Sequence, residues 1–218
     1  MAKRFIFIIL SFILLITYIV ISQPKLPTEP TNTRWVKISK DGKSMGIWKG
    51  PWKCVWDREN GLVWELKGYY KNIYSNECSF SWFDGEIGTQ RQGNCYTQNG
   101  YSDTLELINY FNRKNVCGLK GWRLPTHKEL KTLINHDAPP NAPRTRKDLF
   151  VRTHKAPYWT SDKCIVKDGF FKGKKGAMSV EFMHGKSQCL PYNRALFVRL
   201  VTKVPKDWKP EAKTTPKH

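Results

Sequence analysis

The chain has 218 residues, and its 37 Lys and Arg against 18 Asp and Glu give a formal net charge of +19. Nine tryptophans and eleven phenylalanines provide enough large apolar side chains for a stable core, while no internal repeat and no coiled-coil heptad occurs. A strongly basic surface attracts polyanions, although the same charge can serve solubility alone.

The first feature along the chain is an uncharged apolar run, residues 5–22, directly after Lys3 and Arg4. At 1.5 Å per residue it spans roughly 26 Å, just short of a ~30 Å hydrocarbon core and longer than most signal-peptide apolar regions. We interpret residues 1–22 as an N-terminal membrane anchor, or as a signal peptide cleaved before Gln23. In both cases the rest of the chain lies outside the cytoplasm.

Two segments of low hydrophobicity flank the remaining sequence. Residues 23–34 are rich in Pro and Thr, which predicts an extended linker, and residues 203–218 form a basic, Pro-containing tail. The intervening residues 35–202 have a length that suits one domain.

The predicted domain begins with a β-hairpin. Residues 53–57 and 62–66 are rich in strand-forming side chains, and Asn60-Gly61 between them supplies residues that tolerate a left-handed turn. We therefore expect these two runs to pair as antiparallel strands.

A first helix is predicted after residues 102–104, where Asp103 can cap it. Leu105, Ile108 and Phe111 would form its apolar face, and it would end near Cys117-Gly118.

A second helix is predicted at Thr126, because Thr126 and Glu129 have the spacing of a capping box. Its buried side would consist of Leu130, Leu133 and Ile134. In front of this helix, we interpret Trp122 as a core residue and Arg123 as internally paired.

Strand-like patterns return after Pro157, at residues 158–161, 177–183 and 196–202. Helices flanked by strands without βαβ alternation indicate an α+β fold with an antiparallel sheet, hairpins and two main helices.

Six cysteines follow the apolar run, and an even number in an exported chain favours disulfides. No C-x₂-C pair occurs, so structural zinc is the weaker interpretation. Six cysteines allow 15 connectivities. The residues are Cys54, Cys78, Cys95, Cys117, Cys164 and Cys189.

Basic residues are concentrated between Arg144 and Lys175, where ten of them stand against three acidic ones. This concentration suggests a face that holds phosphate, sulfate or carboxylate groups, with two phenylalanines as apolar contacts. The candidate ligand-binding residues are Arg144, Arg146, Lys163, Lys167, Phe170, Phe171, Lys172, Lys174 and Lys175.

The sequence lacks the common signatures of a zinc, calcium or nucleotide-phosphate site. The five histidines form neither H-x-x-x-H nor H-E-x-x-H, and P-loop and D-x-D-x-D-G motifs are missing. We therefore predict no catalytic residue, no metal, no cofactor and no specific nucleic-acid partner.

Several segments in order resemble the Lcl C-terminal domain family. They are C-V-W-D-R-E-N-G-L-V-W-E from Cys54, Asp103-Thr104, Cys117-Gly118, G-W-R-L-P-T-x-x-E-L from Gly121, Y-W-T-S from Tyr158 and F-V-R-L-V from Phe197. The resemblance implies a loop-rich, exported domain of the bacterial cell envelope that often serves adhesion. The R-L-P-T-x-x-E core resembles, much more weakly, formylglycine-generating enzymes and the C-type-lectin-like group.

The resemblance also implies a disulfide pairing. It suggests Cys54–Cys117 and Cys78–Cys95, which leaves Cys164 with Cys189 around the basic segment 167–176.

Taken together, these features predict an exported envelope binding module that recognises anionic polysaccharides or other polyanions. It would be anchored in the inner membrane through residues 5–22 and face the periplasm, or be secreted if residues 1–22 are cleaved. The alternative is a structural or assembly module that contacts another envelope protein.

Overall fold

The computed structural model describes residues 33–69, 72–97, 100–205, 208 and 210. The predicted anchor or signal peptide (1–22), most of the linker 23–34 and most of the tail 203–218 lie outside this part of the chain. Within the described part, no helix is both long enough and apolar enough to cross a bilayer.

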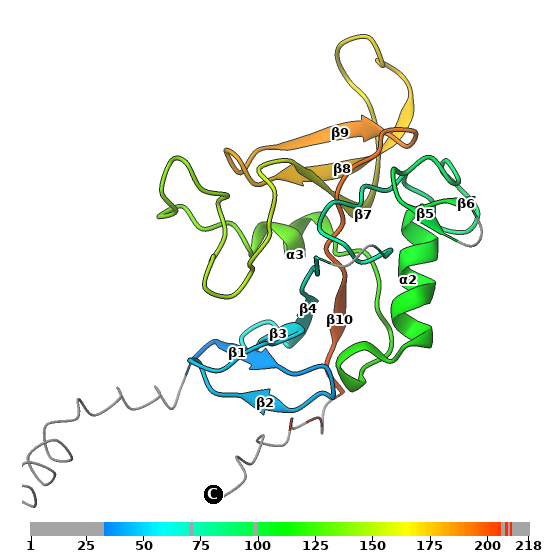
Figure 1. The fold of residues 1–218 in the computed structure, drawn as a ribbon. Helices are drawn as coiled ribbons and strands as arrows, with labels where there is room; N and C mark the ends of the chain where they lie inside the picture. Colours follow the sequence, from blue (N-terminus) through cyan, green and yellow to red (C-terminus); the bar gives the residue numbers. More distant parts are fainter. Residues whose placement is uncertain (1–32, 70–71, 98–99, 206–207, 209, 211–218) are drawn as a thin grey trace, which may run out of the picture. The chain divides into compact units, whose positions relative to one another are not determined.

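The predicted hairpin lies inside an antiparallel five-stranded sheet (Figure 1). Asp57 is paired with Leu62 across the turn, where Gly61 has a φ of 61°. The strand order is β10-β4-β3-β1-β2. The bounds are β1 Trp35–Ile38, β2 Ser44–Met45, β3 Cys54–Asp57, β4 Leu62–Glu65 and β10 Val201–Lys203.

The first predicted helix is α2, Thr104–Arg113, and the Asp103 side chain accepts a hydrogen bond from the Glu106 amide at its start. Leu107 and Phe111 are its buried apolar residues, whereas the predicted Leu105 is only half-buried. The helix ends earlier than expected, and a separate 3₁₀ turn, η1 Val116–Gly118, follows it. Asn115 and Cys117 adopt left-handed backbone conformations here, which are incompatible with a continuous α-helix.

The capping box predicted at the second helix is confirmed in α3, His127–Lys131. Thr126 Oγ1 accepts from the Glu129 amide at 3.2 Å, and Glu129 Oε2 accepts from the Thr126 amide at 2.7 Å. Glu129 also binds both Nη atoms of Arg123 at 2.7 and 2.8 Å. Burial acts to raise the pKa of Glu129, but these hydrogen bonds hold it below its usual value. Trp122 is buried, as expected for a core residue.

We expect Thr126→Ala to lower the free energy of unfolding by about 0.5–2 kcal/mol, because one orphan amide at the helix start loses its acceptor. Thermal unfolding followed by circular dichroism should show a transition a few °C lower, at about 2–4 °C per kcal/mol for a chain of this size. Thr126→Ser keeps the acceptor and should melt close to the wild type. Equal melting of all three proteins would contradict a stabilising role for the cap.

A second, three-stranded sheet has the antiparallel order β7-β8-β9. The predicted runs 158–161 and 177–183 correspond to β7, Pro157–Ile165, and β8, Lys175–Glu181. The sequence did not indicate β9, Ser187–Pro191. The predicted strand 196–202 is wrong over most of its length, because Leu196 and Phe197 form only isolated bridges and β10 begins at Val201. A small hairpin, β5 Tyr96–Thr97 and β6 Gly100–Tyr101, completes the set.

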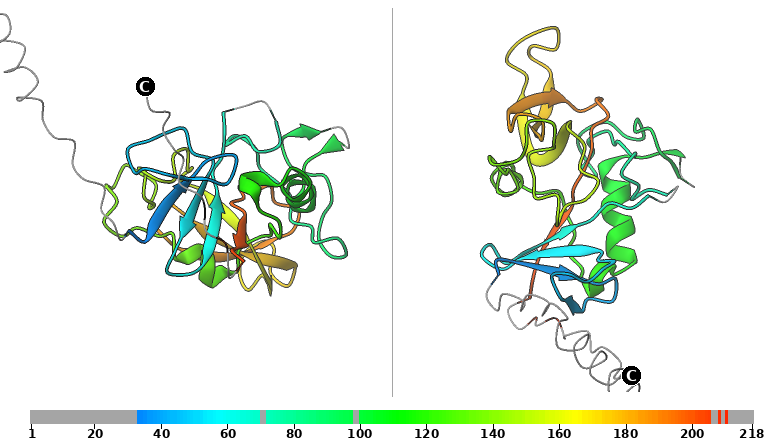
Figure 2. Two further views of the ribbon diagram at one scale, coloured as in Figure 1. Left: turned by 90° about the horizontal axis from the view of Figure 1, so that it is seen from below. Right: turned by 60° about the vertical axis from the view of Figure 1, so that its left-hand side comes forward.

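Both faces of β4 are buried, which explains its nearly continuous apolar sequence. Val63 contributes to one core cluster together with Phe111 of α2. Its neighbours Leu62 and Trp64, on the opposite face, contribute to a second cluster with Leu130 of α3. Figure 2 shows α2 along one side of this sheet.

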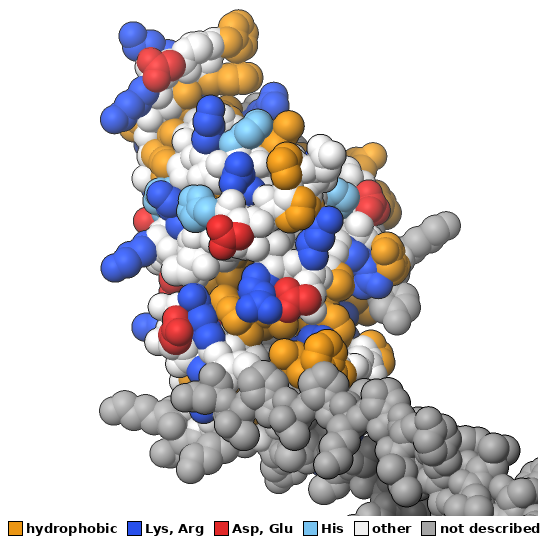
Figure 3. Space-filling view, turned by 90° about the vertical axis from the view of Figure 1, so that its left-hand side faces the viewer, with side chains coloured by type: hydrophobic (Ala, Val, Ile, Leu, Met, Phe, Trp, Pro, Cys, Tyr) orange, Lys and Arg blue, Asp and Glu red, His pale blue; other side chains and the backbone are white. Residues whose placement is uncertain are grey.

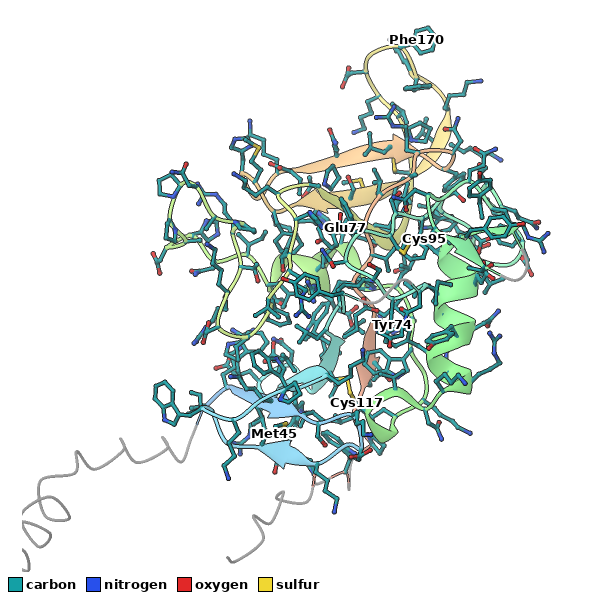
Figure 4. All side chains as sticks on the ribbon, in the orientation of Figure 1. Met45, Tyr74, Glu77, Cys95, Cys117 and Phe170 are labelled. Atoms are coloured by element: carbon teal, nitrogen blue, oxygen red, sulfur yellow. A yellow bond between two sulfur atoms is a disulfide. The ribbon has the colours of Figure 1, made fainter. Side chains whose placement is uncertain are left out.

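Three disulfides join Cys54 to Cys117, Cys78 to Cys95 and Cys164 to Cys189. This is the pairing that the resemblance implied. Figure 4 labels Cys117, in the middle of η1, and Cys95, which directly precedes β5. The described domain is therefore an α+β, disulfide-stapled fold.

Candidate functional site

The segment between β7 and β8, residues 166–174, is a projecting loop with an ordered backbone; we call it the β7–β8 loop. At its base the Val166 amide donates to the Lys174 carbonyl at 2.9 Å, and the Gly173 amide donates to the Val166 carbonyl at 2.8 Å. Gly169 and Gly173 have φ values of 75° and 81°, which L side chains rarely adopt. Figures 1 and 2 show the loop at the opposite end of the domain from β1 and β2.

Phe170 stands at the outer tip of this loop, where Figure 4 labels it. Its side chain is 96% exposed, and its ring meets that of Phe171 edge to face at 5.1 Å. An aromatic ring held almost fully in water on an ordered loop loses hydrophobic stabilisation that burial would give. This ring is therefore available for a partner.

Basic residues flank the two phenylalanines in the sequence of the loop. The four lysines of the β7–β8 loop and its end at β8 are exposed, and none has an ion pair within the described residues. Asp168 is the acidic residue of the loop. At the upper end of the face shown in Figure 3, basic side chains flank hydrophobic ones. The four lysines are Lys167, Lys172, Lys174 and Lys175.

A hollow of about 550 Å³ lies beside the loop. Phe170, Phe171, Lys174 and Lys175 line one part of it, and the segment 191–193 lines another. The hollow therefore combines aromatic surface with two ammonium groups that face no carboxylate in the described structure.

The base of the β7–β8 loop is tied by the Cys164–Cys189 disulfide, which joins β7 to β9. Gly176 of β8 pairs with Cys164 and lies against the Leu190 carbonyl, where a Cβ atom would be only 2.1 Å from the oxygen. Only glycine fits this position, because such an approach is shorter than any real Cβ contact. The loop therefore starts from a closely packed, cross-linked platform.

Lys163 lies on β7, before the loop, and its ammonium is engaged by an acidic residue. Its Nζ is 2.7 Å from Asp84 Oδ2. The hydrogen bond from Lys163, together with those from the backbone amides of Ile87 and Glu86, lowers the pKa of Asp84 to about 2. Lys163 therefore contributes less free positive charge than the sequence suggested.

The segment that carries Arg144 and Arg146, residues 137–155, lies apart from the β7–β8 loop, although both belong to one basic stretch of sequence (Figures 1 and 2). Arg144 donates to the carbonyl oxygens of Met183 and His136, both at 3.3 Å. Arg146 forms a bidentate ion pair with Asp148. Both guanidinium groups thus have partners on their own part of the surface.

A second cationic group, which the sequence reading missed, lies at the end of β4. Lys67 and Glu65 are both buried and their side chains meet at 2.6 Å. Arg199, fully buried, donates to the Glu65 carbonyl at 2.8 Å and to Thr153 Oγ1 at 3.0 Å. Two charged residues two positions apart in the apolar run 62–67 are the sequence signal for this group, since such residues share a strand face.

Within the described residues, no group of three or more His, Cys, Asp or Glu side chains is arranged to hold a metal ion. No curated protein and no solved structure matches the chain significantly, so the weaker resemblance to the C-type-lectin-like group stays a prediction. The model of the Lcl C-terminal domain matches residues 53–202. The chain belongs to the Lcl C-terminal domain family.

Proposed function

We propose that this protein is a binding module of the cell envelope that holds anionic polysaccharides, or other polyanions, through the β7–β8 loop. The observation that carries the proposal is the combination of four exposed lysines with the uncovered ring of Phe170 on an ordered loop. Membership of the family and three disulfides support a place outside the cytoplasm.

Each part of the loop has a physical task in this proposal. The ammonium groups attract sulfate, carboxylate or phosphate groups and accelerate encounter with a polyanion. The phenylalanine rings provide apolar surface for the C–H faces of sugar rings. Because the backbone of the loop is already hydrogen-bonded, little conformational entropy is lost on binding.

The basic residues that the sequence suggested contribute unequally to binding in this proposal. Lys167, Lys172, Lys174 and Lys175 act directly, because they are exposed in the same loop as Phe170 or at its end and have no ion pairs within the described structure. Arg144, Arg146 and Lys163 act weakly or not at all, since protein groups already occupy them.

The test replaces Lys172, Lys174 and Lys175 together by glutamine in the full chain, held in a non-ionic detergent. Exposed ion pairs contribute about 0.2–1 kcal/mol each, so affinity for heparin should fall about tenfold. The dependence of affinity on salt should flatten as well, because screening acts over ~8 Å at physiological ionic strength. Binding is measured by isothermal titration calorimetry at two salt concentrations.

A matched control replaces Lys114, Lys120 and Lys131, which are exposed, by glutamine and changes the net charge equally. Lys114 and Lys120 follow α2 at its far end from the loop (Figure 1). A second control replaces Lys206 and Lys209 of the tail, which lie outside the described residues. Equal losses in all variants would mean that only bulk charge matters.

The second candidate function is assembly with another envelope protein, favoured by the nearly complete exposure of Phe170. Exposed aromatic residues are typical anchors of protein interfaces. Unchanged heparin binding in the loop variant and in both controls would favour this function over polyanion binding.

A further inference from the structure

A cleft of about 750 Å³ opens at the first sheet, away from the β7–β8 loop. Its volume lies in the range of small-molecule sites. Apolar and aromatic side chains line it together with four cationic side chains and the carboxylate of Asp41. The aromatic and cationic residues that line it include Trp52, Lys53, Lys67, Tyr69, Tyr74 and Arg152.

The lining of the cleft holds more positive than negative charge, since four cationic residues stand against Asp41. Glu65 is fully buried, and Lys67 is its ion-pair partner. Lys53 and Arg152 add two further cations. The positive charges of Arg152 and Lys67 both repel that of Lys53. Burial lowers the pKa of Lys53, Glu65 opposes this effect, and Lys67 and Arg152 lower the pKa further. Lys53 thus lies close enough to Lys67 and Arg152 to be repelled by both, and Glu65 offsets part of this repulsion.

Two of these cations have unused hydrogen-bond donors. Lys67 is 3% exposed, and Glu65 is the one carboxylate that its ammonium meets within the described residues. Arg152 Nη1 donates to the Lys67 carbonyl at 3.3 Å, but its Nε is buried and has no acceptor in the described structure. A buried donor without an acceptor costs free energy, which an incoming anion would recover.

Aromatic rings hold the cations in place at the cleft. Lys53 Nζ lies 3.8 Å from the centroid of the Tyr74 ring, and the Arg152 guanidinium lies 3.4 Å from that of Tyr69. Arg152 adopts a φ of 63°, which is uncommon for a residue other than glycine. Such a backbone conformation persists when the surroundings enforce it and often marks a ligand-binding position.

We propose that this cleft is a binding site for a small aromatic carboxylate, distinct from the polyanion site of the β7–β8 loop. The carboxylate lies between Lys53 and Arg152 above Lys67, and the aromatic ring packs against the aromatic walls. A flat guanidinium and two ammonium groups match a carboxylate, whereas the apolar lining requires a hydrophobic body on the ligand. The same chemistry is offered by a free aromatic acid and by an aromatic residue at the C-terminus of a polypeptide.

Three probes of related shape test whether the cleft binds an aromatic carboxylate and whether that carboxylate is a free acid or a chain end. Their binding to the full chain in non-ionic detergent is measured by saturation-transfer NMR. N-acetylphenylalanine carries the carboxylate and a peptide group, N-acetylphenylalanine amide lacks the charge, and 3-phenylpropionate lacks the peptide group. We expect the acid to bind at least about tenfold more tightly than its amide, because charge-assisted hydrogen bonds are lost. Tighter binding of N-acetylphenylalanine than of 3-phenylpropionate indicates a chain end, and equal binding indicates a free acid.

Two variants place the binding in the cleft. Lys53→Gln and Arg152→Gln should each weaken binding of the acid about tenfold. Lys114→Gln, an equal charge change outside the cleft, should leave it unchanged. Lys53 is half-buried and Arg152 has a strained backbone, so circular dichroism checks that each variant is folded. If only one of the two variants folds, its affinity for the acid is enough to test the site. Equal binding of acid and amide, or full binding by both folded variants, would overturn the proposal.

Discussion

Replacement of Glu65 by alanine is expected to lower the free energy of unfolding by about 3–5 kcal/mol, because it leaves the buried Lys67 ammonium without a counter-charge. Glu65 is completely buried, and its carboxylate is the counter-charge that the Lys67 ammonium meets at 2.6 Å. Arg199, also buried, would then add an uncompensated positive charge beside Lys67. Urea unfolding followed by tryptophan fluorescence measures the change.

The matched control is the double replacement Glu65→Leu with Lys67→Met, which removes both charges and keeps most of the volume. Apolar replacement of a whole buried ion pair is often close to neutral. The double variant should therefore be more stable than Glu65→Ala alone. A loss below about 1 kcal/mol in the single variant would mean that the pair is far better solvated than its burial indicates.

Removal of the Cys54–Cys117 disulfide, by replacing both cysteines with alanine, should cost about 4 kcal/mol. The bridge closes a loop with a sequence separation of 63, and long loops lose the most unfolded-state entropy on cross-linking. Both residues are also fully buried in a core cluster, so truncation removes packing. Urea unfolding provides the measurement.

The Cys78–Cys95 bridge serves as the comparison, since its sequence separation is only 17 and the same model gives about 3 kcal/mol. Thiol titration of the denatured, unreduced wild type should find close to no free thiols, which confirms that the starting protein carries all three bridges. A larger loss from the shorter loop would contradict this account, because loop length and burial both favour a larger loss for Cys54–Cys117.

The features that the sequence predicted correctly are those set by a few neighbouring residues. The β3–β4 hairpin depends on Asn60-Gly61, and α3 depends on the Thr126–Glu129 box, so neither requires knowledge of distant contacts. The disulfide pairing came from the family resemblance and not from spacing.

The features that the sequence could not give depend on contacts between distant residues. Strand β9 has little apolar periodicity and exists because it pairs with β8. Residues from 144 to 175 form one basic stretch in sequence, yet folding places Arg144 beside Met183 and directs the loop lysines elsewhere. Lys53, Lys67 and Arg152 line one cleft, although Arg152 is far from the two lysines in sequence, and no local pattern predicts that they lie together.

The position of β10 has a consequence for the order of events during folding. This strand ends the described sheet by pairing with β4, although almost the whole domain lies between the two in sequence. The five-stranded sheet therefore cannot be completed until the segment around Val201 has joined it, because pairing of distant segments must wait for the later one. Until then β4 lacks its outer neighbour, whereas Cys54 and Cys117, which form a disulfide, both precede β10 in the chain.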